Sequence, residues 1–567
     1  MNNILYKGQK LNDFRELVNL YKTTYKDLTA FEYKEKPSST EHIKISYAQF
    51  AKDIENLGAA LLEKNLKRVC LIGNNRYEWF VSYLAITTAG LTVVPLDKSL
   101  PDNEIISLIE RSEADGIIFS EKYANAVNTS KESIKNLTTI CMDSSNNFEM
   151  LNTLLKKGEE VDHSKYNDLK IDNKAMSIML FTSGTTNISK AVMISQYGIC
   201  MNLYSLSQMI DINTKDRFLS FLPLHHTFES STTFLFGTSC GITVVLCDGL
   251  KYIQQNLVEF HITGFVCVPL MLEIMYKKIL KSIDKQGKTK IINILRRVFR
   301  HAPINVKRKV FKPIIDGLGG NLKTIIAGGA SMAKDALQGY NDFGFDVHQG
   351  YGLTETGPVL IAESIRYKKA GSIGVEMPGV IAKIDNPDKD GVGEIIAKTP
   401  CIMLGYYQNE EATNEAIDKD GWFHTGDLAY KDKKGFYFVT GRKKDMIVLK
   451  NGKKIFPEEL EFLINKLPYV AESMVFGKLD DTKNDRNEDI ILMAKIVYNK
   501  DEIKKSFADS KEEDYKTLIL NDIKTQINKQ MPAYKYIRDI IVTDKPLIKT
   551  TTQKIKRHEE MKVINQK

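Results

Sequence analysis

One short segment combines the residue types that bind phosphate groups. Residues 181–191 read FTSGTTNISKA and contain four hydroxyl side chains, one glycine and one lysine, namely Thr182, Ser183, Thr185, Thr186, Gly184 and Lys190. Consecutive backbone N–H groups and hydroxyls in such a loop form a concave donor surface for phosphate oxygens, and the lysine can neutralise their charge. The segment is not a Walker A loop, because Ala191 follows the lysine in place of a magnesium-binding hydroxyl. Two interpretations stay open: a phosphate-binding loop, or a Ser/Thr/Gly loop without a ligand.

A second segment, HQGYGLTETGPV at residues 348–359, has one acidic residue among uncharged neighbours. Its glycines permit a turn close to a ligand, and Tyr351 offers a flat ring. A lone acid such as Glu355 can hold Mg²⁺ that bridges phosphates, because this ion prefers one or two carboxylates plus phosphate oxygens. The alternative is a strand-to-helix turn in which Thr354 and Glu355 are ordinary capping residues.

Two further segments carry isolated charges. GWFHTGDLAY at residues 421–430 places Asp427 after a turn. A carboxylate there can accept hydrogen bonds from both hydroxyls of a ribose, although TGD is also ordinary turn chemistry. Near the C-terminus, PLIKTTTQKIKR offers Lys554 among uncharged Thr and Gln, where a lysine can be carried into a site.

These segments belong to an alternation of apolar strands and amphipathic helices. From about residue 65, RVCLIG, LTVVPL and GIIF alternate with helical stretches, and the rhythm resumes after residue 191. This alternation predicts parallel sheets covered on both faces. Between about 371 and 442, short strands and tight turns predict a small β-barrel or sheet, and the charged tail after about 444 mixes helices and strands. The predicted fold class is α/β, with a large N-terminal domain (1–443) that includes the barrel and a small α+β C-terminal domain (444–567).

Length and composition fit such a multidomain protein. The chain has 567 residues, which exceed one hydrophobic core, and its apolar share of 43% is that of an ordinary globular protein. No apolar run approaches the length needed to span a bilayer, and the N-terminus lacks the apolar core of a signal peptide. The seven cysteines form no CxxC pair, which predicts free thiols in a reducing, cytoplasmic setting.

The formal net charge of +8 is modest for this length. The densest basic segment, ILRRVFRHAPINVKRKVFKP at residues 294–313, mixes Arg and Lys with Phe, Val and Ile. One interpretation is peripheral contact with anionic lipid headgroups, in which Arg296, Arg297 and Lys307 take part. The interpretation we favour is a helix pair whose basic side chains face water. Nucleic-acid binding is not expected, because the basic residues follow no recognised module.

The order and spacing of these segments resemble the acyl-adenylate-forming superfamily of acyl-CoA synthetases, adenylation domains and firefly luciferase. The resemblance runs from about residue 40 to the end and covers at least five motifs in the right order. The residue sequences IIAGGASM and HQGYGLTETGPV, together with Glu229 after Thr-Phe, are most similar to those of the long-chain fatty acyl-CoA synthetase branch.

The resemblance implies one nucleotide site. It assigns the β- and γ-phosphates of ATP to the loop at 182–190 and the α-phosphate and Mg²⁺ to Thr354 and Glu355. Asp427 matches the ribose ligand, with Arg442 beside it. The remaining ATP- or AMP-binding residues that the resemblance implies, around the adenine and its pocket, are Tyr351, Gly328, Gly329, Ala330, Gln349, Gly350 and Gly352.

The resemblance also implies a second set of residues, which act on the acid and the thiol. Lys554 matches the catalytic lysine that bridges the acid and the α-phosphate. Lys444 matches the hinge of a mobile C-terminal domain, and Gly452 matches the loop presented to the pantetheine arm of CoA. His226 matches the histidine of the substrate-gating segment LPLHHTFE. The alternative makes His225 and His226 a helix-start pair of no special role.

Two departures from the family pattern fall inside these motifs. The usual Gly-x-Pro-Lys-Gly is replaced by NISKA at residues 187–191, and Gln553 stands where a glycine usually precedes the lysine. Losing two glycines and a proline alters loop flexibility, so we expect changes in rate and ATP affinity more than in the identity of the ligand.

The function that follows is ATP-dependent activation of a fatty acid through acyl-AMP, then transfer to CoA, with Mg²⁺ as cofactor. The apolar stretches SSTTFLFG and VPLMLEIM either line a tunnel for an alkyl chain or belong to the core. Two alternatives stay open for the function: an acyl-AMP ligase that serves a carrier protein, or a degenerate protein that binds nucleotide or acyl groups without catalysis.

Overall fold

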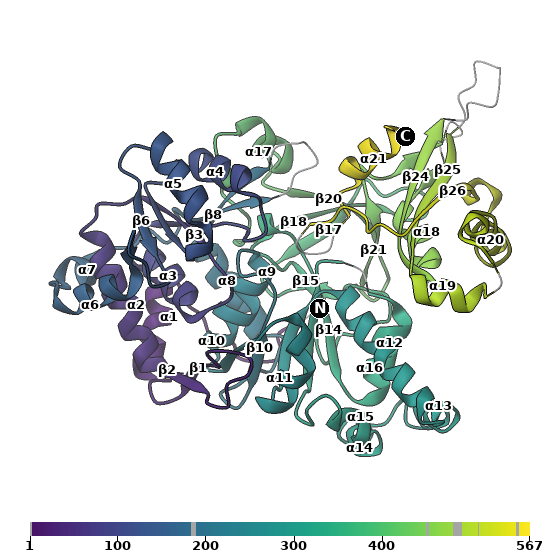
Figure 1. Cartoon of the computed structure of the whole chain (residues 1–567), viewed down its shortest axis with the longest axis horizontal. Coiled ribbons are helices and arrows are strands. Elements are labelled where there is room, and N and C mark those ends of the chain that lie inside the picture. Colours follow the sequence, from purple (N-terminus) through teal and green to yellow (C-terminus); the bar gives the residue numbers. More distant parts are fainter. Residues whose placement is uncertain are drawn as a thin grey trace. The chain divides into compact units, whose positions relative to one another are not determined.

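The computed structural model describes residues 3–182, 189–330, 332–449, 453–479, 490–508, 510–550 and 555–566 (Figure 1). The chain divides into two compact units. The first contains Met1–Ala382 and Ala397–Phe423, and the second contains Lys383–Ile396 and His424–Lys567. The large sheets lie in the first unit, and the mixed helices and strands of the chain's end lie in the second.

A mostly parallel sheet forms one half of the first unit. Its order is β16-β15-β14-β13-β12-β10-β11-β1-β2, in which the neighbours from β14 to β1 are parallel and β2, β15 and β16 pair antiparallel at the edges. The strands are β1 (Thr29–Tyr33), β2 (Ile43–Ser46), β10 (Arg217–Ser220), β11 (Thr243–Leu246), β12 (Gly264–Cys267), β13 (Thr324–Gly328), β14 (Asp346–Tyr351), β15 (Ile361–Ala362) and β16 (Val375–Glu376).

A second sheet runs in the order β19-β9-β8-β4-β3-β5-β6-β7. Neighbours from β8 to β7 are parallel, whereas β9 pairs antiparallel with both β8 and β19. The segment FTSGTTNISKA therefore joins the two strands of a hairpin. The strands are β3 (Arg68–Ile72), β4 (Thr92–Pro95), β5 (Gly116–Phe119), β6 (Thr138–Cys141), β7 (Glu149–Met150), β8 (Met176–Thr182), β9 (Lys190–Ser195) and β19 (Gly405–Tyr406).

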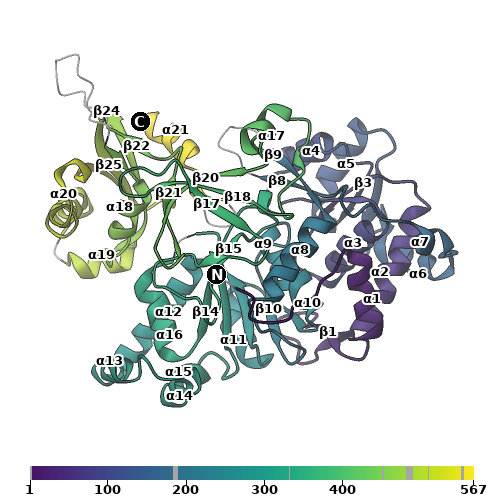
Figure 2. The same ribbon diagram turned by 180° about the vertical axis from the view of Figure 1, so that it is seen from behind.

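Helices cover the faces of both sheets (Figure 2). Cys70 and Ile72 of β3 pack into one core with α4 and α5, while Val69 and Leu71 alternate to the other face and α3 contacts the same strand. In the other half, α11, α12 and α16 pack on the parallel sheet. The helices of the first unit include α1 (Phe14–Thr23), α2 (Tyr47–Leu62), α3 (Tyr77–Thr88), α4 (Asp102–Arg111), α5 (Ala124–Ser133), α6 (Leu151–Glu160), α7 (Ser164–Asp168), α8 (Gln196–Ser207), α9 (Thr227–Glu229), the π-helix η2 (Ser230–Phe236), α10 (Gly237–Ser239), α11 (Ile253–Glu259), α12 (Pro269–Lys285), α13 (Thr289–Val298), α14 (Ile304–Val310), α15 (Lys312–Asp316), α16 (Lys334–Phe343) and α17 (Glu410–Ala416).

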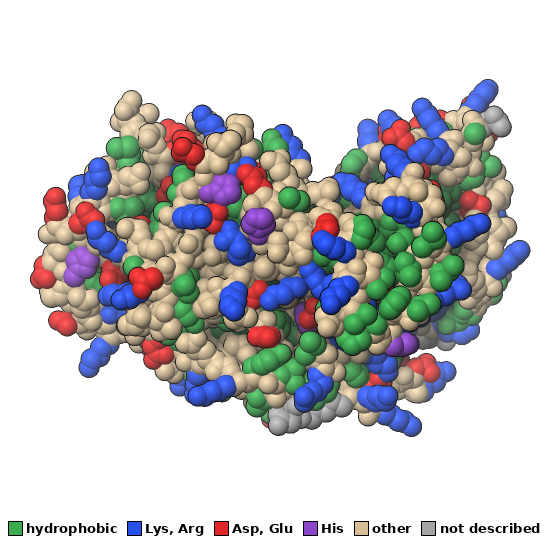
Figure 3. Space-filling view, turned by 90° about the horizontal axis from the view of Figure 1, so that it is seen from below, with side chains coloured by type: hydrophobic (Ala, Val, Ile, Leu, Met, Phe, Trp, Pro, Cys, Tyr) green, Lys and Arg blue, Asp and Glu red, His purple; other side chains and the backbone are tan. Residues whose placement is uncertain are grey.

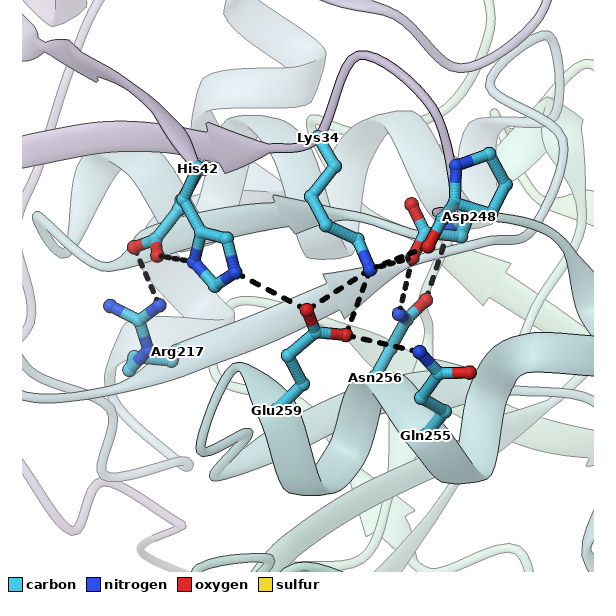
Figure 4. Close-up of polar contacts among 9 residues, drawn as sticks. Lys34, His42, Arg217, Asp248, Gln255, Asn256 and Glu259 are labelled. Atoms are coloured by element: carbon cyan, nitrogen blue, oxygen red, sulfur yellow. Dashed lines mark hydrogen bonds and ion pairs between the residues drawn. The ribbon is translucent and has the colours of Figure 1, made fainter. Parts of the chain in front are cut away.

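A network of buried and partly buried charged side chains joins several of these elements (Figure 4). Lys34 Nζ, after β1, lies 2.9 Å from Glu259 Oε2 on α11 and 3.0 Å from Asp248 Oδ2 after β11. Burial lowers the pKa of Lys34, but the hydrogen bonds with both carboxylates outweigh it and raise the pKa above its ordinary value. Glu32, His42 and Arg217 extend this Lys34 network, in which every carboxylate faces a Lys, Arg or His.

The second unit contains the smaller sheets. One runs in the order β17-β18-β20-β21, one pairs β22 with β23, and one runs β24-β25-β26 with β24 antiparallel and β26 parallel to β25. Met474 and Phe476 pack on one face of the last sheet with α21, and Val475 packs on the other with α18 and α20. The elements are β17 (Ile381–Asp385), β18 (Gly393–Lys398), β20 (Phe423–Lys431), β21 (Tyr437–Arg442), β22 (Ile447–Val448), β23 (Lys454–Ile455), α18 (Pro457–Ile464), β24 (Val470–Leu479), β25 (Ile490–Tyr498), α19 (Lys500–Ser506), α20 (Tyr515–Asp522), η6 (Ile523–Ile527), β26 (Ile537–Thr543) and α21 (Arg557–Asn565).

Three sequence predictions can be compared with these elements. The strands expected to form a small barrel between 371 and 442 are mainly the sheet β17-β18-β20-β21. All seven cysteines are free thiols, as expected. The basic run 294–313 does form helices, but its side chains do not all face water, because Lys307 is buried and donates to the carbonyl oxygen of Asn341. No helix among the described residues is both long enough and apolar enough to cross a membrane.

Candidate active site

Glu355 lies in a short 3₁₀ turn, Thr354–Thr356, directly after β14. The hydroxyl of Thr356 accepts a hydrogen bond from the backbone N–H of Leu353 at 2.9 Å, so Thr356 caps this turn. The Glu355 side chain instead accepts from the hydroxyl of Tyr406 at 2.9 Å. The capping role that the sequence also allowed for Glu355 is therefore taken by its neighbour, and its carboxylate is directed to β19.

Tyr406 connects this carboxylate to a lysine. β19 pairs antiparallel with β9, and Lys190 at the start of β9 places Nζ 4.7 Å from the centroid of the Tyr406 ring. Burial raises the pKa of Tyr406, and the Glu355 carboxylate raises it further, so the phenol stays a hydrogen-bond donor. In the described part of the chain, no Lys, Arg or His forms an ion pair with Glu355. The negative charge of Glu355 is thus held by a hydroxyl and is left without a cation partner among these residues.

The ends of the glycine- and threonine-rich segment are visible in the structure. Thr182 and Lys190 face each other across the β8–β9 hairpin. Arg111 at the end of α4 donates from Nη1 to the Ser189 hydroxyl at 3.0 Å and from Nη2 to the Ser189 carbonyl oxygen. Arg111 was not predicted as a site residue, because the contact spans 78 positions and no local pattern marks it. The predicted residues Ser183, Gly184, Thr185, Thr186, Asn187 and Ile188 lie outside the described residues, as do Gly452, Gln553 and Lys554.

The ends of β13 and β14 bring predicted pocket residues together. Gly328 and Gly350 are partners in this parallel pair, and Gly329 and Ala330 follow β13 with exposed backbone. A Cβ on Gly328 would lie 2.7 Å from the ring of Phe228, so a glycine there lets the aromatic ring approach the strand. Crevices beyond the carboxyl ends of parallel strands are the usual ligand sites of α/β sheets, and the adenine pocket expected at this edge stays a prediction.

Residues on either side of Tyr351 are constrained by packing. Gln349 is buried, and its side-chain amide donates to the carbonyl oxygen of Ser372 at 2.9 Å. A Cβ on Gly352 would lie 2.0 Å from the carbonyl oxygen of Pro358, which excludes any other residue at this position. Tyr351 itself is half-buried at the end of β14. The nucleotide contacts expected of these three residues stay predictions.

The segment LPLHHTFE begins the helical run from α9 to α10. His226 is the N-cap residue of α9 without a side-chain capping bond, and His225 Nε2 lies 3.5 Å from Asp97 Oδ2, an ion-pair distance. Burial raises the pKa of Asp97, but His225 and Ser99 outweigh it and hold the pKa below its ordinary value. The helix-start position is thus shown for His226, and its gating role stays a prediction.

Glu229, three residues further on, is fully buried. It accepts hydrogen bonds from Ser220 at 2.7 Å and from Thr233 at 3.0 Å. Burial raises the pKa of Glu229 to about 8, although the two hydroxyls oppose this shift. At neutral pH the carboxyl therefore carries its proton. The sequence singled out Glu229 as a branch marker but gave no sign of its protonation.

In the second unit, Asp427 and Arg442 are opposite partners on β20 and β21. Arg442 Nε donates to Asp427 Oδ1 at 2.9 Å, so the two residues are adjacent as the resemblance implied. Lys443 donates through its backbone N–H to the carbonyl oxygen of Gly426 and forms an ion pair with Glu394. Lys444, the expected hinge, follows directly in the turn after β21.

The donor set around Glu355 fits Mg²⁺ that is shared with a phosphate ligand. Among the described residues, no group of three His, Cys, Asp or Glu side chains could hold a metal on its own. Mg²⁺ commonly takes one or two carboxylates and completes its shell with water and phosphate oxygens. A single carboxylate that lacks a described cation partner is suited to that arrangement.

Family comparisons identify the chain. The AMP-binding enzyme family matches residues 21–407. The chain belongs to the AMP-binding enzyme family. The C-terminal domain of AMP-binding enzymes matches residues 444–566 of this family member. The resemblance to acyl-adenylate-forming enzymes, first seen in the order of the motifs, is confirmed.

Relatives of this AMP-binding enzyme differ in what they act on. A long-chain-fatty-acid–CoA ligase of Mycobacterium bovis is 26% identical and is matched over 76% of this chain and 75% of its own length. A chloroplastic long-chain-fatty-acid–[acyl-carrier-protein] ligase of Arabidopsis thaliana is 24% identical over 91% of this chain and 81% of its own. An indoleacetate–CoA ligase of Aromatoleum aromaticum is 27% identical over 77% and 81%. Family membership alone therefore does not fix the acid or its acceptor.

Solved structures agree with the fold. ATP-bound MatB from Rhodopseudomonas palustris superposes with a TM-score of 0.78 at 20% identity and covers 98% of this chain and 99% of its own. The o-succinylbenzoate CoA synthetase of Bacillus subtilis in complex with ATP and magnesium superposes with a TM-score of 0.72 at 21% identity, covering 96% and 99%. The predicted α/β architecture, with a large domain of parallel sheets and a smaller C-terminal domain, is confirmed as the adenylate-forming fold.

Proposed function

We propose that the protein is an AMP-forming acid–thiol ligase that activates a fatty acid with ATP and transfers the acyl group to CoA. The observation that carries the proposal is the arrangement of Glu355, Tyr406 and Lys190 in a member of the AMP-binding family. The Glu355 carboxylate, which accepts from the Tyr406 hydroxyl, is the proposed group for Mg²⁺. Lys190, whose ammonium lies over the same ring, is the proposed group for phosphate. The ATP- and magnesium-bound relatives support the choice of nucleotide and ion.

The first proposed step makes acyl-AMP. A free carboxylate does not acylate a thiol, because its oxygen is a poor leaving group. The acid therefore first attacks the α-phosphorus of ATP. The bond from this phosphorus to the oxygen that bridges it to the β-phosphorus breaks, and pyrophosphate leaves. Positioning and charge stabilisation dominate such a transfer. Lys190 and the 182–186 loop bind the β- and γ-phosphates, Thr354 contacts the α-phosphate, and Lys554 bridges it to the acid. Glu355 would hold Mg²⁺, which would supply positive charge to offset the negative charge of the nucleotide.

The nucleoside part of ATP is assigned to two separate groups of residues. We propose that Tyr351 stacks on adenine at the ends of β13 and β14, where Gly328, Gly329 and Ala330 leave space. Gln349, Gly350 and Gly352 shape the same pocket through their backbone. Asp427 accepts the ribose hydroxyls, and Arg442, which donates to Asp427 Oδ1, orients that carboxylate.

The second proposed step makes the thioester. The thiol sulfur of CoA attacks the acyl carbon, loses its proton, and AMP leaves. For this step the domain at 444–567 turns about Lys444, withdraws Lys554 and presents the loop at Gly452 to the narrow pantetheine arm. His226 gates entry of the acid. The free thiols of all seven cysteines support the proposed reducing, cytoplasmic location.

A fatty acid is the proposed substrate because two relatives are named for long-chain fatty acids. The tunnel considered for SSTTFLFG finds no support, since Ser230–Phe236 is buried and Phe234 packs edge-on against Phe80 with ring centroids 4.7 Å apart. The test is acid-dependent ATP–pyrophosphate exchange across acids from two to eighteen carbons. Exchange that peaks with long chains supports the proposal, and exchange with none of them overturns it in favour of a non-catalytic binding protein.

A second candidate is transfer to a carrier-protein pantetheine, favoured by the Arabidopsis relative that matches 91% of the chain. Thioester formation with free CoA contradicts it, whereas formation with carrier protein alone supports it. The Lys554→Ala variant separates the two half-reactions in either case. It should lose adenylation and keep thioester formation from supplied acyl-AMP; normal adenylation would overturn the role of Lys554.

A further inference from the structure

Helix α13 has apolar side chains on both its inner and its outer face. Ile292 and Leu295 pack against the core of the parallel sheet. Ile291, Ile294 and Val298 are 61%, 61% and 69% exposed, and their spacing places them on one stripe. A surface helix of a globular protein normally presents polar residues on that outer face. The exposed apolar stripe of α13 is therefore a candidate interaction surface.

The neighbouring helix enlarges this apolar area. α12 contacts α13 and exposes Leu270, Ile274 and Leu280. We name the exposed apolar residues of the two helices the α12–α13 surface. α13 lies at the lower edge of Figure 1, and the view from below shows hydrophobic side chains gathered in that part of the molecule with Lys and Arg around them (Figure 3). Contiguous exposed apolar patches of this kind usually mark an interaction site.

The charge of the α12–α13 segment is strongly one-sided. Residues 269–300 contain nine basic and two acidic residues, while the whole chain has a formal net charge of +8. One of the two acids, Glu273, is turned inward and accepts a hydrogen bond from the backbone N–H of Ala333 at 2.8 Å. Of the basic residues, Lys285, Lys288, Lys290 and Arg297 are exposed. Most of the net positive charge of the protein therefore lies in the segment that carries the outer apolar stripe of α13.

Apolar residues rimmed by positive charge fit an anionic bilayer better than other partners. A second copy of this chain would bring the same basic rims together, which is repulsive. A nucleic acid would pair with the lysines but would leave the aliphatic side chains in water, since it binds through phosphates and stacking on aromatic rings. Anionic lipid offers both headgroup charge and an apolar layer beneath it.

We propose that the α12–α13 surface docks the protein peripherally on membranes that contain anionic phospholipid. The apolar stripe of α13 enters the boundary between headgroups and acyl chains, and the surrounding lysines and Arg297 contact the headgroups. Arg296 and Lys307, which the sequence suggested for this role, do not take part. Arg296 is paired with the buried Asp342, and Lys307 is itself buried. The docking does not depend on the proposed enzymatic function.

The test is sedimentation of the full-length protein with phosphatidylcholine vesicles that do or do not contain phosphatidylglycerol. The protein should bind only the anionic vesicles, and binding should weaken as salt is added. Replacing Ile291, Ile294 and Val298 together by Asn should weaken binding at least about tenfold, because the apolar insertion is lost. Replacing Lys288, Lys290 and Arg297 together by Glu should abolish it.

Matched variants elsewhere on the chain control for general effects. Leu250→Asn with Ile381→Asn removes two aliphatic side chains that are 68% and 63% exposed. The triple change of Lys419, Lys433 and Lys434 to Glu alters the net charge by the same amount at exposed positions. Both controls should bind like the wild type, and all variants should keep the wild-type unfolding midpoint.

Three results would overturn the proposal. The first is that the wild type fails to bind anionic vesicles. The second is that the α13 variants bind as well as the wild type. The third is that the control variants lose as much binding as the α13 variants lose. A fourth result, a wild-type dimer in solution that the α13 Asn variant dissociates while vesicle binding persists, would assign the surface to a second copy of the chain.

Discussion

Two parts of the first unit hold carboxylates in opposite ways. In the Lys34 network, Glu32, Asp248 and Glu259 each face a Lys, Arg or His, so their charges are matched inside the protein (Figure 4). Glu355 and Glu229 are instead held by hydroxyl groups, from Tyr406 in one case and from Ser220 and Thr233 in the other. A carboxylate paired with a cation keeps its charge inside the protein, whereas a carboxyl group held only by hydroxyls can bind a proton, as Glu229 does, or a cationic ligand, as proposed for Glu355.

The largest effect is expected where a matched charge is removed. Lys34→Met leaves the buried Asp248 without its cation and the partly exposed Glu259 with only His42, and this should lower the free energy of unfolding by about 3 kcal/mol. Denaturant unfolding measures it. Lys312→Met is the control, because its exposed pair with Asp316 should contribute less than about 0.5 kcal/mol. Equal losses for both variants would contradict the distinction between the two regions.

Glu355→Gln should reduce activity while leaving stability nearly unchanged. It removes the charge proposed to hold Mg²⁺ and should slow acid-dependent ATP–pyrophosphate exchange by roughly 10²- to 10³-fold, about 3 kcal/mol of transition-state stabilisation. The unfolding midpoint should change little, since an amide can still accept from Tyr406. Glu113→Gln is the control, because Glu113 accepts from the adjacent tyrosine, Tyr407, at 2.6 Å and also pairs with Arg68. A comparable loss of exchange in that control would remove Glu355 from the site.

Glu229→Gln tests the carboxyl that carries a proton. The pKa of Glu229 is raised from 4.5 to about 8 in the folded protein, so between these values the unfolded chain is ionised while the folded chain is protonated. Wild-type stability therefore falls as pH rises through this window, by roughly 2 kcal/mol between about pH 6 and 7.5, relative to the Gln variant. The exposed Glu132→Gln variant should instead track the wild type. Parallel pH profiles for Glu229→Gln and wild type would show that Glu229 is ionised in the fold.

The smallest effect is expected for Tyr406→Phe. This change keeps the ring beneath Lys190 and removes the hydroxyl that donates to Glu355. Loss of one such hydrogen bond should cost about 1 kcal/mol, or roughly fivefold in exchange rate. Tyr407→Phe should leave exchange unchanged. A loss as large as that of Glu355→Gln would mean that Tyr406 contacts the nucleotide directly.

The sequence predicted those parts of the molecule that depend on local pattern. The alternation of strands and helices predicted the parallel sheets, whereas the role that the motif around Glu355 suggests for its carboxylate stays a prediction. Tyr406 and Arg111 were missed, because their contacts with Glu355 and Ser189 span 51 and 78 positions and neither residue differs locally from its neighbours.

Burial was the other property that the sequence did not predict. The Lys34 network draws its members from residues 32 to 259, so no window of sequence contains it. Lys307 belongs to a basic run that favours the surface, yet its ammonium group is buried against the end of α16. Helix α13 also divides in a way that the sequence did not predict, because Ile292 and Leu295 pack inward whereas Ile291, Ile294 and Val298 are exposed. These differences arise from tertiary packing, which decides the side of a helix that faces inward.

The contact of Arg111 with Ser189 fixes the described C-terminal end of the segment at residues 181–191. The family pattern Gly-x-Pro-Lys-Gly has proline here, a residue whose ring restricts the backbone; this chain has Ser189, which is held by the guanidinium of Arg111 on α4. A restraint made by hydrogen bonds from a helix is reversible, unlike the covalent ring of proline. The position of Ser189, the residue before Lys190 at the start of β9, therefore depends on a helix that is 78 positions away in sequence.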